Sequence, residues 1–261
     1  MFHYRKLYAD LVSDSGLVCI AYVAELRVLG HLQRSAGYEC YATDGSRTVV
    51  HARGAARVDL SAARLAIQFD TPSGAFSYEL TRTGPALDEH RLVPGLSWQV
   101  VSPVARASAR GVPGFEELHG DGYSDCVQMW RPPRALGLRS LSWGRGTAEG
   151  EPFVFTEARF RNGVRFQSAH VAGVNHQSFA LHSLGSSGLE LHAALASLRI
   201  EEQRVLHDGA ALDALRFPRR AERALVELLT GSVRERRALA QVTTSTNERG
   251  AALYERVTFG D

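Results

Sequence analysis

The feature that most constrains the fold is a repeated alternation of apolar and polar residues in short runs. Phe76, Tyr78 and Leu80 alternate with polar residues, which is typical of a strand with one buried face. Pairs such as Asp44-Gly45 and Asn162-Gly163 lie between runs of this kind and favour the tight turns of β-hairpins. Antiparallel strands in this number avoid open edges by closing into barrels. The sequence therefore predicts an all-β fold of antiparallel β-barrels.

One segment departs from the period of two. Within Arg219–Leu229, the residues Ala221, Leu225 and Leu228 lie at helical spacing. A proline at the start and a glycine just beyond the end are typical of helix boundaries. We therefore expect one helix near residues 218–230.

A cluster of turn-forming residues divides the strand-rich chain into two halves. Gly111-Val112-Pro113-Gly114 is the strongest such break near the middle. It predicts an N-terminal barrel over residues 1–113 and a C-terminal barrel with the helix over residues 114–261. A barrel of about eight strands has room inside for one small ligand, so either half could hold one.

Charge and cysteine content limit the partners and the compartment. The formal net charge of +2 is too near neutral to indicate a nucleic acid or an anionic membrane as partner. The three cysteines are widely spaced and form no C-x-x-C pair, which suits free thiols in a reducing compartment. The chain does not open as a signal peptide would, and its longest apolar runs are too short to span a bilayer. We expect a cytoplasmic protein with no transmembrane segment and no nucleic-acid partner.

Motifs for metals and cofactors are missing from the sequence. The spacing of His170, His176 and His182 does not match the close pairs of zinc sites. No G-x-G-x-x-G or P-loop follows a strand, and there is no G-x-S-x-G nucleophile motif. We therefore expect no metal and no cofactor.

The central stretch resembles a known superfamily. Gly122-Tyr123-Ser124-Asp125, and later Ser142-Trp143-Gly144-Arg145, are similar to motifs of the lipocalin-like superfamily that contains carotenoid 1,2-hydratase and the AttH-type proteins. The opening Tyr8–Gly16 resembles the first strand and turn of that superfamily. The resemblance implies two lipocalin-like barrels and an aspartate that donates a proton to an isolated double bond. The sequence departs from the superfamily after Asp125, where His-Asn is replaced by Cys126-Val127.

Asp125 and Tyr123 are the candidate catalytic residues. On an alternating strand they share a face, and burial among apolar groups raises the pKa of a carboxyl so that it can donate a proton near neutral pH. Trp130 and Trp143 are candidate substrate-binding residues whose ring faces could stabilise a developing carbocation. In the alternative reading, Asp125 caps a turn or pairs with Arg145, which we also count among the candidate binding residues.

Further polar residues on strands of the first half are candidates for a ligand pocket. If they point into the barrel, they provide the few polar groups of a mostly apolar site; otherwise they face solvent. These residues are Tyr38, Glu39, Tyr41, Glu25 and Arg27.

Together these features predict a cofactor-independent enzyme that acts on a hydrophobic, unsaturated small molecule such as a terpenoid or polyketide. The expected reaction is acid-assisted hydration, isomerisation or cyclisation. Two alternatives remain open: a non-catalytic lipocalin-like carrier of an apolar ligand, and a structural protein with filled barrels.

Overall fold

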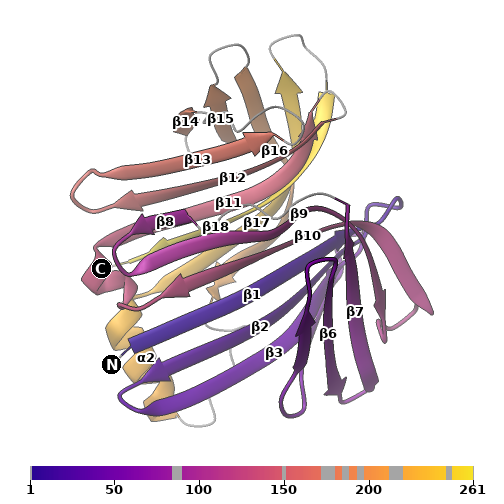
Figure 1. Cartoon of the computed structure of the whole chain (residues 1–261), viewed down its shortest axis with the longest axis horizontal. Coiled ribbons are helices and arrows are strands. Elements are labelled where there is room, and N and C mark those ends of the chain that lie inside the picture. Colours follow the sequence, from indigo (N-terminus) through magenta and orange to yellow (C-terminus); the bar gives the residue numbers. More distant parts are fainter. Residues whose placement is uncertain are drawn as a thin grey trace. The chain divides into compact units, whose positions relative to one another are not determined.

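The computed structural model describes residues 2–83, 90–148, 151–171, 180–183, 188–192, 197–211, 220–244 and 249–260. Within them the chain divides into two compact units, Met1–Arg131 and Pro132–Asp261. Within the described residues the strands of both units pair in antiparallel fashion (Figure 1). The predicted all-β class is confirmed, whereas the count of two domains stays a prediction.

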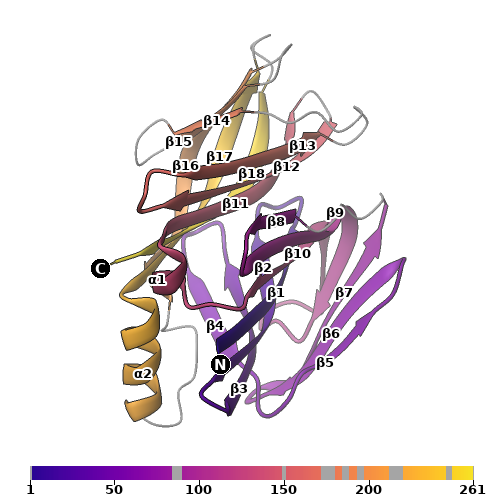
Figure 2. The same ribbon diagram turned by 60° about the vertical axis from the view of Figure 1, so that its left-hand side comes forward.

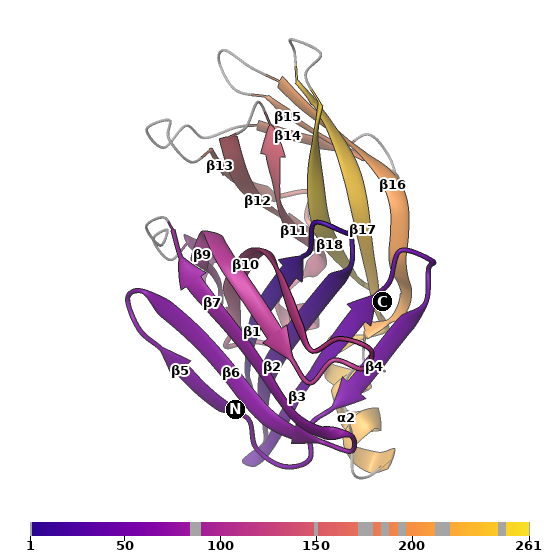
Figure 3. The same cartoon turned by 90° about the vertical axis from the view of Figure 1, so that its right-hand side faces the viewer.

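The first unit contains one ten-stranded sheet with the order β4-β3-β2-β1-β10-β9-β7-β6-β5, and β8 pairs with β9. Its strands are β1 (Phe2–Val12), β2 (Val18–Val28), β3 (His31–Tyr41), β4 (Arg47–His51), β5 (Arg57–Leu60), β6 (Arg64–Thr71), β7 (Gly74–Arg82), β8 (His90–Val93), β9 (Leu96–Arg110) and β10 (Glu117–Met129). Figure 3 shows β1, β2, β3 and β4 side by side in this sheet.

The second unit contains an eight-stranded sheet with the order β13-β12-β11-β18-β17-β16-β15-β14. Its elements are α1 (Pro133–Leu136), β11 (Leu138–Ala148), β12 (Glu151–Phe160), β13 (Arg165–Val171), β14 (Ala180–Ser183), β15 (Gly188–His192), β16 (Ser197–Ala210), α2 (Arg220–Thr230), β17 (Val233–Thr244) and β18 (Arg249–Phe259).

The helix predicted near residues 218–230 is confirmed as α2, although residues 218 and 219 lie outside the described residues. A second, four-residue helix, α1, was not expected from the sequence. It begins at a proline and ends at Gly137, whose φ of 65° is left-handed. The two helices are in contact (Figure 2). No helix in the described parts of the chain is long and apolar enough to cross a membrane.

The turn cluster Gly111–Gly114 lies inside the first sheet. It joins β9 to β10, and the backbone N–H of Phe115 donates to the carbonyl of Val112 at 3.1 Å. Because β10 then pairs with both β9 and β1, the chain does not leave the first sheet at this turn. The division between the two compact units follows Arg131 instead of the turn cluster.

The apolar core of the first unit follows from the alternation in the sequence. Phe76, Tyr78 and Leu80 are at most 1% exposed, while the residues between them reach the surface to differing degrees. The ring of Phe76 stacks on those of Tyr38 and Phe69, with centroids 4.4 and 4.8 Å apart. Burial of large aromatic groups on one face of the sheet is the dominant stabilising contribution here.

Candidate active site

Asp125 lies in β10 and is completely buried. Its Oδ2 accepts hydrogen bonds from the Tyr123 hydroxyl at 2.8 Å and from the Trp98 indole N–H at 3.3 Å. Its Oδ1 has no hydrogen-bond partner among the described residues. The carboxyl is therefore held at one oxygen by two neutral donors, and its other oxygen remains available.

The strand register explains how these groups meet. Tyr123 and Asp125 are two residues apart on β10, so both side chains leave the same face. The pairing of β10 with β9 changes register twice near Ser124, so β9 has extra residues there. One of them is Pro103, which has no N–H to donate. Beyond this irregularity Trp98 lies diagonally across from Asp125, within reach of its carboxyl group.

Burial raises the pKa of Asp125 to about 7, although the hydrogen bonds from Tyr123 and Trp98 and the positive charge of Lys6 act to lower it. The negative charge of Asp10 acts in the same direction as burial. Burial and the neighbouring Asp125 also hold the pKa of Tyr123 well above its usual range, so the phenol stays protonated. The carboxyl can thus exist in either protonation state near neutral pH, which suits a general acid.

This site occupies the face of the first sheet opposite its apolar core. Leu7 and Cys126 belong to the core, so the residues that alternate with them on β1 and β10 face the other way. Tyr8 is the cross-strand neighbour of Asp125, and its ring lies edge-on to Tyr123 with centroids 6.3 Å apart. Where the sequence departs from the superfamily motif, Cys126 accordingly faces the core.

The aromatic face continues onto β2. Tyr22 is the cross-strand neighbour of Tyr8, and its hydroxyl lies 3.2 Å from Nδ1 of His51. Gly37 stands opposite Tyr22 on β3. A Cβ at Gly37 would lie 2.8 Å from the Tyr22 hydroxyl oxygen and 2.5 Å from the carbonyl oxygen of Val50. The missing side chain therefore makes room for the tyrosine.

Cross-strand pairing leads from Glu39 on β3, through one residue on β2 and one on β1, to Tyr123 on β10. Directly paired residues share a face of the sheet, so Glu39 and Tyr41 lie on the same face as Asp125. Glu39 is fully buried. Its Oε2 accepts a hydrogen bond from the Tyr41 hydroxyl at 2.5 Å and pairs with Arg47 at 2.8 Å. These two expected pocket residues thus form a paired polar group on the face of the candidate site.

The other expected pocket residues of the first unit are not brought together with Asp125. Tyr38 faces the apolar core, and its hydroxyl donates to the carbonyl of Gly111 at 3.3 Å. Glu25 and Arg27 lie near the end of β2, where Arg27 is 45% exposed and Glu25 pairs with Arg34 at 3.3 Å.

The remaining candidates lie farther along the chain. Trp130 directly follows β10 and is 46% exposed, with its ring near that of His3. Trp143 and Arg145 belong to β11 in the second unit, where Trp143 is buried opposite Glu255. Tyr123 and Trp98, which donate hydrogen bonds to Asp125, both lie in the first unit, so these bonds hold the carboxyl without Arg145.

Sequence reasoning missed Trp98 and Tyr8. Tyr8 stands between Lys6 and Asp10 in a β1 pattern of polar residues at every second position, and that pattern could have indicated a polar face. Trp98 reaches Asp125 only through the pairing of β9 with β10, which no local pattern contains.

In the described parts of the chain, no three His, Cys, Asp or Glu side chains lie close enough together to hold a metal ion. His176, one of the histidines considered above, lies outside the described residues.

Comparison with known proteins gives structural likeness only. No protein-family model and no curated protein matches the sequence. Over 98% of this chain and 88% of that chain, the structure is similar to CghA solved with Sch210972, with a TM-score of 0.70 and 11% identity. An AttH-type protein from Nitrosomonas europaea has a TM-score of 0.67 and 10% identity, over 98% of this chain and 92% of that chain.

Kievitone hydratase from Nectria haematococca has a TM-score of 0.60 and 7% identity, over 98% of this chain and 89% of that chain. At these identities the likeness concerns the fold. It confirms that the fold resembles those of these three proteins.

Proposed function

We propose that this protein is a cofactor-independent enzyme that protonates a carbon–carbon double bond of a hydrophobic small molecule, with Asp125 as the proton donor. The observation behind the proposal is the unequal environment of the two carboxyl oxygens. Because Oδ2 accepts two hydrogen bonds, the acidic proton of the neutral form belongs on Oδ1, which has no partner among the described residues. An acid proton on that oxygen is free to move to a substrate.

The chemistry follows from this proton transfer. The Oδ1–H bond breaks, a C–H bond forms, and a carbocation and a carboxylate result. Tyr123 and Trp98 then stabilise the carboxylate, since hydrogen bonds to a charged acceptor are stronger than those to a neutral one. Addition of water, loss of a different proton or attack by a second double bond gives hydration, isomerisation or cyclisation.

Two similar structures favour this class of chemistry: one is named a hydratase, and the other was solved with a small molecule. The substrate proposed here is a terpenoid or polyketide with an isolated double bond. Tyr123 is assigned to hold Asp125 in place, and Glu39 and Tyr41 to border the substrate on the same face of the sheet.

The test combines native mass spectrometry with deuterium incorporation. The purified protein is examined for a co-purifying apolar molecule and is then incubated in D2O with a panel of terpenoid and polyketide alkenes. We expect deuterium to enter a product with the wild-type protein, and we expect Asp125→Asn to reduce that rate by about 10²–10⁴. The matched control is Asp59→Asn at an exposed position of β5, which should leave the rate unchanged.

Two results would contradict the proposal. Equal deuterium incorporation by wild type and Asp125→Asn removes Asp125 from the mechanism. Binding of an alkene by both proteins without incorporation in either identifies a carrier instead of an enzyme.

A further inference from the structure

A pocket of about 560 Å³ lies within the second unit, among strands β11, β12, β17 and β18 and the start of β13. Its size falls within the usual range of small-molecule sites. The charged residues of its lining are Arg139, Glu157, Arg159, Arg165, Arg234 and Arg256. None of these residues belongs to the candidate active site on β10.

The charges of the lining residues are strongly unbalanced. The pocket has five arginines and one acidic residue, Glu157, whereas the whole chain has 30 basic and 28 acidic residues. Nearly every basic side chain of this protein is an arginine, so the number of arginines alone says little about the pocket. The excess of arginines over acidic residues in the lining is more informative. Such an excess in a concave site attracts anions.

Two of the five arginines already have acidic partners. Arg159 pairs with the buried Glu157, which consumes the only acidic residue of the lining. Arg234 pairs at 2.7 Å with Asp208, a residue outside the lining. These two guanidinium groups are therefore balanced within the protein.

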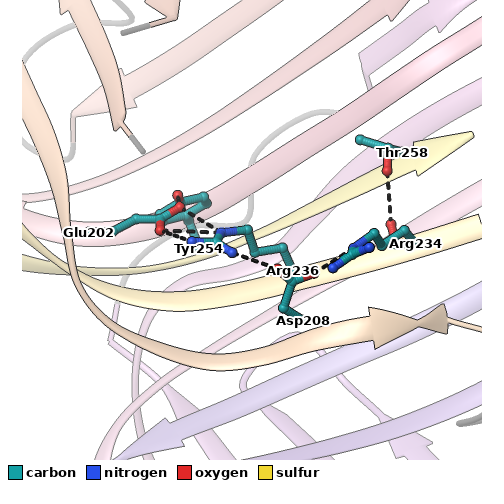
Figure 4. Close-up of polar contacts among 6 residues, drawn as sticks. All are labelled: Glu202, Asp208, Arg234, Arg236, Tyr254 and Thr258. Carbon is teal, nitrogen blue, oxygen red and sulfur yellow. Dashed lines mark hydrogen bonds and ion pairs between the residues drawn. The ribbon is translucent and has the colours of Figure 1, made fainter. Parts of the chain in front are cut away.

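Arg234 belongs to a ladder of polar contacts along the strands (Figure 4). Asp208 also pairs with Arg236 at 2.6 Å, and Arg236 pairs with Glu202 at 2.5 Å. The hydroxyl of Tyr254 donates to the same glutamate. Two arginines thus meet two carboxylates, so the ladder is neutral and holds one wall of the pocket in place.

Among the described residues, three arginines of the lining lie in no ion pair, although the positive charge of Arg256 acts on Glu202. These three arginines are Arg139, Arg165 and Arg256. The guanidinium of Arg256 makes one long hydrogen bond, from Nε to the Ser142 hydroxyl at 3.4 Å. Most of the N–H groups of these three side chains are therefore available to a ligand.

We propose that this pocket binds a small organic oxyanion, a carboxylate or a phosphate ester, whose charged group pairs with Arg139, Arg165 and Arg256. Guanidinium groups bind both oxyanions through paired, charge-assisted hydrogen bonds. The apolar part of the ligand packs on Phe160 and Phe259, which line the same pocket. The pocket shares no lining residue with the candidate active site.

Calorimetric titration tests this with four probes: octyl phosphate, octanoate, octanol and inorganic phosphate. We expect at least one of the first two to bind, the neutral alcohol not to bind, and inorganic phosphate to bind more weakly than octyl phosphate. The ratio of octyl phosphate to octanoate affinity identifies the preferred oxyanion. Affinity should fall at high salt, because the attraction is electrostatic.

The variant R139Q/R165Q should weaken binding about tenfold or more per arginine, the usual effect of losing a charged hydrogen bond. Both side chains are exposed, so the variant should fold like the wild type, and circular dichroism checks this. Arg57→Gln, an equally exposed change on β5, is the matched control and should not alter affinity. Equal binding of octanol and octyl phosphate, or unchanged affinity in R139Q/R165Q, would overturn the proposal.

Discussion

Replacing Asp125 by asparagine should change the pH dependence of stability in a specific way. The side chain is completely buried, and burial raises the pKa of its carboxyl to about 7. Asparagine has nearly the same size and keeps an oxygen that can accept the hydrogen bonds of Tyr123 and Trp98. It cannot ionise, so it removes the titration while leaving the local packing in place.

The size of the effect follows from the two pKa values of Asp125. In the unfolded chain an aspartate has a pKa of about 3.9. Because the folded pKa is higher, folding favours the protonated form, and this contribution is complete below about pH 4 and is lost as the pH rises to about 7. The total loss is about 4 kcal/mol, since a tenfold change in a proton equilibrium corresponds to about 1.4 kcal/mol.

Urea unfolding of wild type and Asp125→Asn at about pH 5 and about pH 8 measures this loss. The difference in free energy of unfolding, variant minus wild type, should increase by about 2–3 kcal/mol from pH 5 to pH 8. Other titrating groups cancel in the comparison, and Asp59→Asn should show no such gain. A constant difference at both pH values would refute a raised pKa, and a uniformly less stable variant would instead indicate a carboxylate needed as an ion-pair partner.

Three further predictions concern other buried contacts. Tyr123→Phe removes a hydrogen bond that lowers the pKa of Asp125, so the alkaline limb of a pH–rate profile should move to higher pH, by about one pH unit. Gly37→Ala would place a Cβ 2.8 Å from the Tyr22 hydroxyl oxygen, and urea unfolding should show a loss of about 1–3 kcal/mol. Arg237→Met would leave two buried carboxylates without their shared arginine, and urea unfolding at neutral pH should show a loss of about 3–5 kcal/mol that becomes smaller in acid.

Local sequence patterns predicted the parts of the fold that depend on neighbours in the chain. The period of two in Phe76–Leu80 identified β7, and the helical spacing near Leu225 identified α2. The shared face of Tyr123 and Asp125 was equally accessible, because residues two apart on a strand point the same way. These features need no knowledge of which strands pair.

The remainder of the candidate site depends on strand pairing. Alternation places Tyr38 and Glu39 on opposite faces of β3, but both side chains are fully buried, so hydrophobicity could not identify which face holds the core. Trp98 meets Asp125 because of a register that the irregularity near Pro103 sets. The turn cluster Gly111–Gly114 was a valid turn signal, and a turn signal does not distinguish a hairpin within one sheet from a passage between two.

The neighbours of the buried acids explain why Asp125 is the group best suited to proton transfer. Four buried glutamates each pair with an arginine: Glu39, Glu157, Glu235 and Glu255. In each of them the carboxylate is held by a guanidinium group, and the pair braces the structure. Asp125 instead accepts hydrogen bonds from a phenol and an indole, both neutral, and burial raises its pKa to about 7. A carboxyl in that environment can release and regain a proton near neutral pH.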